Sequence, residues 1–129
     1  MNAQHTVAPR RALLVLGAAL TLLPAAAVAH NKPQFGGIVA EAGGLDLELV
    51  LKPTQAVLHV SDHGKPIDLQ GGSAKLTILA GTAKTEAALA LTAGKFEATG
   101  SYPAAKGTKV VAVVTLPGRK PVTARFELK

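Results

Sequence analysis

Apolar residues alternate with polar ones along much of the chain after residue 44. In segment 45–51 leucine occupies every second position, with Asp46 and Glu48 between the leucines. Successive side chains of a β-strand point to opposite faces, so this period of two indicates a half-buried strand. Four further rows share the pattern: Ala56, Leu58 and Val60; Ala74, Leu76 and Ile78; Val110, Ala112, Val114 and Leu116; Val122, Ala124, Phe126 and Leu128. Each row predicts the core-facing side of a strand.

Turn-forming residues separate these rows at short intervals. They are Gly43-Gly44, Lys52-Pro53, 62–66, Gly71-Gly72, Ala80-Gly81, Ala93-Gly94, Lys106-Gly107 and Pro117-Gly118. Glycine and proline supply the backbone angles that tight turns require. Seven or eight short strands at this spacing predict an all-β fold, a single antiparallel immunoglobulin-like β-sandwich. Segment 83–91 is rich in alanine, which favours helix, but its alternation leads us to expect a strand.

The first 29 residues have the parts of a cleavable signal peptide. Arg10-Arg11 precedes the apolar run 12–23, and Ala27-Val28-Ala29 has the A-x-A form of a cleavage site. These twelve residues span about 18 Å as a helix, whereas the hydrocarbon layer is roughly 30 Å thick, so an uncleaved anchor is disfavoured. We expect general secretion, rather than twin-arginine export, to the periplasm. The mature domain would be 30–129, beginning with an extended or loosely held arm at 30–36.

Composition removes several functional classes. The chain has no cysteine, which excludes a disulfide framework, thiolate metal sites and a cysteine nucleophile. No serine lies in a G-x-S-x-G motif, and the eight carboxylates are scattered over strand positions that we expect to be solvated. The lysines are dispersed and aromatic residues are few, which disfavours nucleic-acid binding. We therefore expect neither an enzyme nor a nucleic-acid-binding protein.

The first candidate site residue is His30. Cleavage after Ala29 would give it a free α-amine, and this amine and the imidazole Nδ1 can chelate one metal in a six-membered ring. Nitrogen-rich tetragonal sites suit Cu(II). The competing interpretation is that His30 is simply the residue that follows the cleavage site.

His59 and His63 are the other candidates, with Asp62 beside them. Both imidazoles would project from one face if the strand runs as far as residue 63. Alternatively, segment 62–65 forms a turn that leaves His63 exposed while His59 packs on the second face of the sheet. Neutral imidazoles bind metal, and acid would protonate them and release it.

Four segments, 30–42, 48–50, 59–66 and 107–111, resemble a group of small exported proteobacterial proteins. Those proteins are similar to a β domain attached to some periplasmic adaptor subunits of heavy-metal efflux systems. The resemblance implies an association with copper or other metal handling, with a periplasmic component of a metal efflux system as the partner. The metal-linked relatives often carry a histidine before the glycine pair, where this chain has Phe35.

The sequence thus predicts a periplasmic carrier or buffer for Cu(II) or another divalent metal, without an organic cofactor and free of the membrane after cleavage. Its ligands would be His30 with His59 or His63, and Asp62. The alternative is a protein-interaction module without a metal site. That module would use a strand edge or the second sheet face, which carries Val50, Val57, Val111 and Val113.

Overall fold

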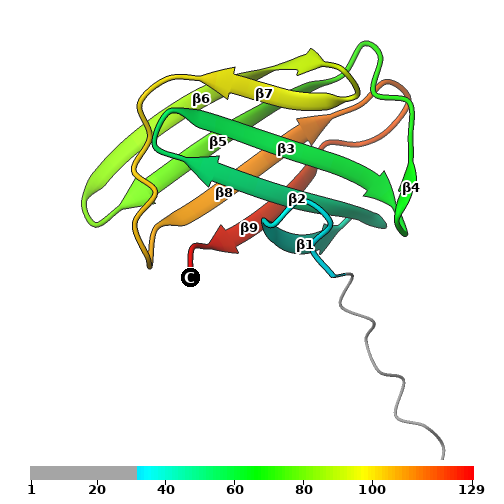
Figure 1. Ribbon diagram of the computed structural model, residues 1–129. Helices are drawn as coiled ribbons and strands as arrows, with labels where there is room; N and C mark the ends of the chain where they lie inside the picture. Colours follow the sequence, from blue (N-terminus) through cyan, green and yellow to red (C-terminus); the bar gives the residue numbers. More distant parts are fainter. Residues whose placement is uncertain (1–31) are drawn as a thin grey trace, which may run out of the picture.

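The computed structural model describes residues 32–129, which form β-strands and no helix (Figure 1). The strands are β1 (Ile38–Ala42), β2 (Leu45–Lys52), β3 (Gln55–Asp62), β4 (Lys65–Pro66), β5 (Ser73–Ala80), β6 (Ala83–Thr92), β7 (Lys95–Thr99), β8 (Lys109–Thr115) and β9 (Val122–Glu127). The all-β prediction is confirmed, including the strand expected in the alanine-rich segment. The predicted signal peptide and His30 lie outside the described residues. Within the described part of the chain, no helix is long and apolar enough to cross a membrane.

Hydrogen bonds join the strands into one antiparallel path. Its order is β1-β2-β3-β7-β6-β5-β8-β9, and β4 is attached to β3. Strand β6 links the two halves, because 83–89 pair with β5 whereas 90–92 pair with β7. The two ends of the path, β1 and β9, lie close together. The sheet is therefore nearly closed and is continuous where the sequence led us to expect two separate sheets.

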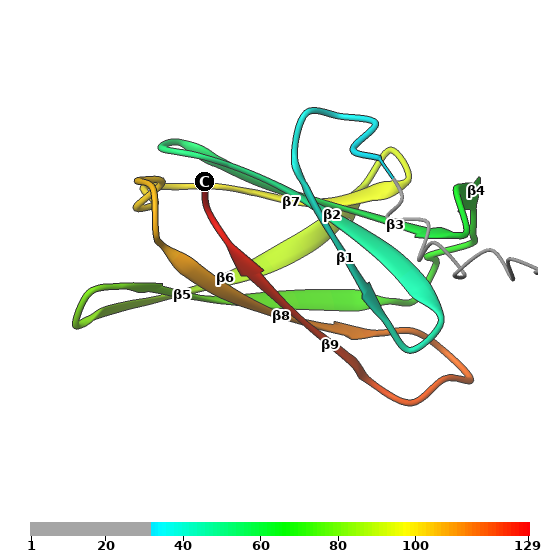
Figure 2. The same cartoon turned by 90° about the horizontal axis from the view of Figure 1, so that it is seen from below.

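The core lies between the two halves of this folded sheet. In Figure 2, β2, β3 and β7 lie on one side and β5, β8 and β9 on the other. Every residue of the four predicted rows is buried, as are Leu45, Leu47 and Leu49. Phe96 of β7 is the largest fully buried side chain. The period of two therefore identified most of the core correctly.

Strands β1 and β7 did not give a clear row in the sequence. Each has only five residues, and alanine occupies positions in both. Their place in the fold comes from pairing with longer neighbours, since β1 pairs with β2 and β7 joins β3 to β6. A strand this short carries too few alternating positions for its period to stand out.

Candidate functional site

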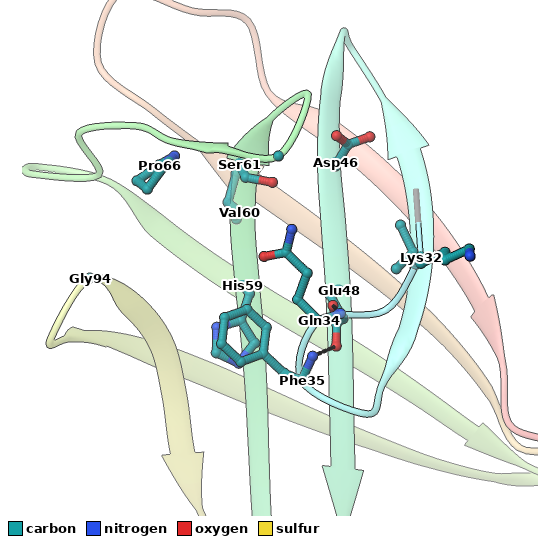
Figure 3. A pocket seen from close by; sticks show the side chains of 12 residues that line it. Lys32, Gln34, Phe35, Asp46, Glu48, His59, Val60, Ser61, Pro66 and Gly94 are labelled. Carbon is teal, nitrogen blue, oxygen red and sulfur yellow. Dashed lines mark hydrogen bonds between the residues drawn. The ribbon is translucent and has the colours of Figure 1, made fainter. Parts of the chain in front are cut away.

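A buried carboxylate attaches the amino-terminal part of the described chain to the sheet. Segment 32–37 crosses the outer face of β2, and Glu48 accepts three backbone hydrogen bonds from it (Figure 3). The donors are the N–H groups of Gln34 at 2.7 Å, Phe35 at 2.7 Å and Gly37 at 3.0 Å. Hydrogen bonds to an ionised acceptor are stronger than neutral ones, and here they compensate the burial of the charge. We call segment 32–37 the arm.

The glycine pair allows the arm to approach β2 closely. Gly36 has a φ of +74°, a backbone conformation that glycine adopts without steric cost. A Cβ atom on Gly37 would clash with the carbonyl oxygen of Leu49. The pair Gly36-Gly37 therefore permits a contact that a side chain would block.

Phe35 of the arm covers His59 of β3. The two rings are stacked with centroids 3.6 Å apart and an interplanar angle of 7°. His59 lies opposite Glu48 in the β2–β3 register and is half-buried. Burial lowers the pKa of His59, an effect that Glu48 opposes and Lys95 reinforces. At neutral pH the ring is accordingly in the uncharged form, the form that can bind a metal.

His63 lies in a tight turn after the end of β3. Asp62 pairs with Lys65, and the two residues between them, His63 and Gly64, both have positive φ angles, 50° and 82°. This is the pattern of a type I′ hairpin turn, so of the two interpretations of segment 62–65 the turn is correct. The His63 Nδ1 lies 2.5 Å from Asp62 Oδ1. That hydrogen bond and the charge of Asp62 raise the pKa of the exposed His63.

The structure thus brings Asp62 and His63 together and places His59 in a different environment under Phe35. His59 lies on β3 and His63 in the turn that follows it, with three residues of β3 between them. His30 lies outside the described residues. Within residues 32–129 there is no group of three or more His, Cys, Asp or Glu side chains placed to hold a metal.

Two carboxylates depart from the sequence-based expectation. The acidic side chains were predicted to be solvated, but Asp46 is only 8% exposed and Glu48 only 6% exposed. The prediction was wrong for these two because it treated the outer face of β2 as open to water, whereas the arm covers it. The one feature of the sequence that could have indicated this cover was the glycine pair Gly36-Gly37. It allows a segment without periodicity to fold back onto β2.

A cavity of about 150 Å³ lies between the arm and the sheet. Its lining includes Lys32 and Gln34 from the arm, Asp46 and Glu48 from β2, and His59 and Ser61 from β3, with Gly64, Pro66 and Gly94 at its borders (Figure 3). Asp46 Oδ2 is buried and has no hydrogen-bond partner within the described residues. The cavity therefore has a polar end at which a carboxylate is incompletely satisfied.

The four valines considered for a docking face lie in two places. Val50 and Val57 face each other across β2 and β3, and Val57 is buried. Val111 and Val113 lie on β8, between β5 and β9, and Val113 is exposed. These valines therefore form two separate pairs along the strand path.

The two histidine environments predict opposite pH dependences of stability in metal-free protein. The folded-state pKa of His59 lies below its ordinary value of 6.5, so its contribution is present above pH 6.5 and is lost as the pH falls through the folded-state pKa. The folded-state pKa of His63 lies above 6.5, so its contribution is present below pH 6.5 and is lost as the pH rises through the folded-state pKa.

Urea unfolding across pH 5–8 checks this pair of signs. Relative to the wild type, His63→Gln should make the free energy of unfolding rise more steeply with pH around 6.5, and His59→Gln should make it rise less steeply. Equal slopes for the two variants would contradict the assignment of the pKa directions.

Comparisons with known proteins leave the site without a precedent. The chain matches no protein-family model, and neither a curated protein nor a solved structure is significantly similar to it.

Proposed function

We propose that the protein is an exported, non-enzymatic carrier or buffer for a divalent metal, with Cu(II) as the best candidate. Its ligands are the α-amine and imidazole of His30, with His63 completing the site and Asp62 orienting His63. The observation that carries the proposal is the position of the arm, whose Gln34 lies beside the turn that presents His63. A Cβ on Gly64 would be 3.8 Å from the Gln34 Nε2.

The Asp62–His63 pair suits metal binding. Histidines that bind metals almost always donate their second ring N–H to a carboxylate or carbonyl group, which fixes the ring orientation. Asp62 holds Nδ1 of His63, which leaves Nε2 for a metal. The exposed position of the turn gives an ion direct access. His59 is the alternative ligand, but the stacked Phe35 ring covers one face of it.

The short stretch of chain between residue 30 and Lys32 supports a role for His30 as a ligand. Lys32 lines the cavity that Gly64 also borders. Two residues span at most about 7 Å, so the α-amine of a chain that starts at residue 30 would lie within about that distance of the Lys32 backbone. Glu48 holds the backbone of Gln34, Phe35 and Gly37, which limits how far Lys32 can move from the cavity.

Signal cleavage after Ala29, periplasmic location and a metal efflux component as partner belong to the same proposal. They rest on the sequence pattern and on the stated family resemblance. The immunoglobulin-like sandwich type is proposed as well, and the arrangement of strands on two sides of one core supports it (Figure 2).

Electron paramagnetic resonance of Cu(II) added to the processed protein at neutral pH tests the proposal. We expect a spectrum with nitrogen coordination that is lost when the amine is acetylated and in His63→Ala, and retained in His59→Ala. A wild-type spectrum identical to that of Cu(II) in buffer would reject metal binding. Loss of the nitrogen coordination in His59→Ala alone would show that His59, and not His63, is the ligand.

Asp62→Ala should weaken Cu(II) binding by about 10-fold, since removal of the carboxylate that orients a ligating histidine costs 10- to 100-fold in affinity. Competition against a chelating dye measures the change. Asp68→Ala is the matched control, because Asp68 is an exposed aspartate whose carboxylate accepts a hydrogen bond from the Gln70 N–H group and not from a histidine. Equal affinities for Asp62→Ala and Asp68→Ala would show that Asp62 does not support the site.

A further inference from the structure

The cavity beneath the arm contains a carboxylate whose burial is not explained by the metal site. Asp46 is more than nine-tenths buried, and its Oδ2 has no partner within residues 32–129. An unpaired buried acceptor destabilises the fold, and more so when it is charged. Glu48, two residues along the same strand, shows the contrast because three N–H groups satisfy it. Asp46 lacks such donors, and the side chain lines an open cavity.

Two polar side chains that carry acceptor oxygens line the cavity together with Asp46. Ser61 lies directly opposite Asp46 in the β2–β3 register and has a hydroxyl group, and the side-chain amide of Gln34 lines the same cavity (Figure 3). A primary ammonium group carries three N–H donors and one positive charge. It therefore matches a site made of one carboxylate and two neutral acceptors.

The rest of the cavity sets the size and character of the ligand. Val39 and Pro66 provide apolar surface beside the polar end. A volume of about 150 Å³ accommodates roughly six non-hydrogen atoms, as a benzene-binding cavity of similar size shows. Lys32 lines the same cavity with a positive charge, which disfavours a ligand carrying a second ammonium group.

We propose that this cavity binds a small primary alkylammonium ion, with Asp46 as its charge partner and Ser61 and Gln34 as additional acceptors. The same chemistry is available from two sources, a free alkylamine or the α-ammonium group that processing creates at the start of the chain. With a free alkylamine as the ligand, the site uses none of the groups assigned to Cu(II) and stands if the metal proposal fails. The chain's own α-ammonium group is the His30 amine of the metal proposal, so with this source the two proposals compete for one group.

Titration of the purified protein with n-butylammonium chloride, followed by amide NMR, tests the proposal. We expect saturable shifts at Asp46, Ser61 and Gln34, reduced at least tenfold in affinity in Asp46→Asn and unchanged in the matched control Asp68→Asn. n-Butanol lacks the charge and tetramethylammonium lacks N–H donors, so neither should cause these shifts. Equal shifts with either compound, or with Ca²⁺ at lower concentration, would overturn the assignment.

A second variant keeps the test valid if Asp46→Asn fails to fold. Lys32 is exposed, so Lys32→Gln should leave the fold intact and bind n-butylammonium about threefold more tightly, because a repelling charge is removed. Unchanged or weaker binding would count against the site.

Acetylation of the amino terminus distinguishes the two sources of ammonium. If the chain's own α-ammonium fills the cavity, acetylation alone shifts the resonances of Asp46, and n-butylammonium binds only to the acetylated protein. If the ligand is a free amine, acetylation has no effect on these resonances or on binding. Absence of any response at Asp46, to acetylation and to n-butylammonium alike, would overturn the proposal.

Discussion

Replacement of Phe96 by alanine is expected to lower the free energy of unfolding by about 3–5 kcal/mol. The Phe96 ring is 0% exposed and is the largest buried side chain of the core. It lies on β7, where it pairs with Leu58 of β3 and Leu91 of β6. The substitution therefore leaves a cavity at the point where the strand path turns from one half of the sheet to the other.

Urea unfolding monitored by circular dichroism measures this loss. Phe35→Ala is the matched control, because it removes the same atoms from a ring that is 55% exposed. The stacked contact with His59 is expected to contribute only about 0.5–1.5 kcal/mol. A loss for Phe96→Ala as small as the one expected for Phe35→Ala would contradict the central place of Phe96 in the core. A typical domain is stable by about 5–15 kcal/mol, so Phe96→Ala removes a substantial part of that stability.

Glu48→Ala is expected to release the arm and to lower the free energy of unfolding by about 1.5–3 kcal/mol, the range for hydrogen bonds to a charged group. The loss is no larger because the freed N–H groups of Gln34, Phe35 and Gly37 can bond to water once the arm detaches. Hydrogen exchange at these three amides should accelerate in the variant, while exchange in β5 and β8 stays slow.

Glu86→Ala provides the comparison for Glu48→Ala. Glu86 forms surface ion pairs with Lys75 and Lys84 at 3.4 and 3.6 Å, and exposed pairs of this kind contribute about 0–1 kcal/mol. Unchanged exchange at residues 34–37 in Glu48→Ala would mean that Phe35 and the glycine pair hold the arm without the carboxylate.

Part of the candidate site was predictable from the sequence and part was not. The turn at 62–65 was one of the two interpretations of its residue types, because histidine adopts positive φ angles more often than most residues and glycine adopts them without steric cost. The environment of His59 did not follow, since its stacking partner Phe35 is separated from it along the chain and belongs to a segment without periodicity. The burial of Asp46 and Glu48 was missed for the same reason. The arm that covers them does not alter the alternation of apolar and polar residues in β2.

The alternation in the sequence predicted most of the strands and their core-facing sides, with β1 and β7 as exceptions. Alternation records which side of each strand meets apolar neighbours, and the glycine and proline turns mark where each strand ends. Only the tertiary structure decided that the strands form one nearly closed sheet and that the arm crosses its outer face. Those features depend on contacts between distant residues, such as the bond from Gln34 to Glu48 across 14 positions. A single hydrogen bond between distant residues produces no repeating pattern in the sequence, so it becomes visible only in the folded chain.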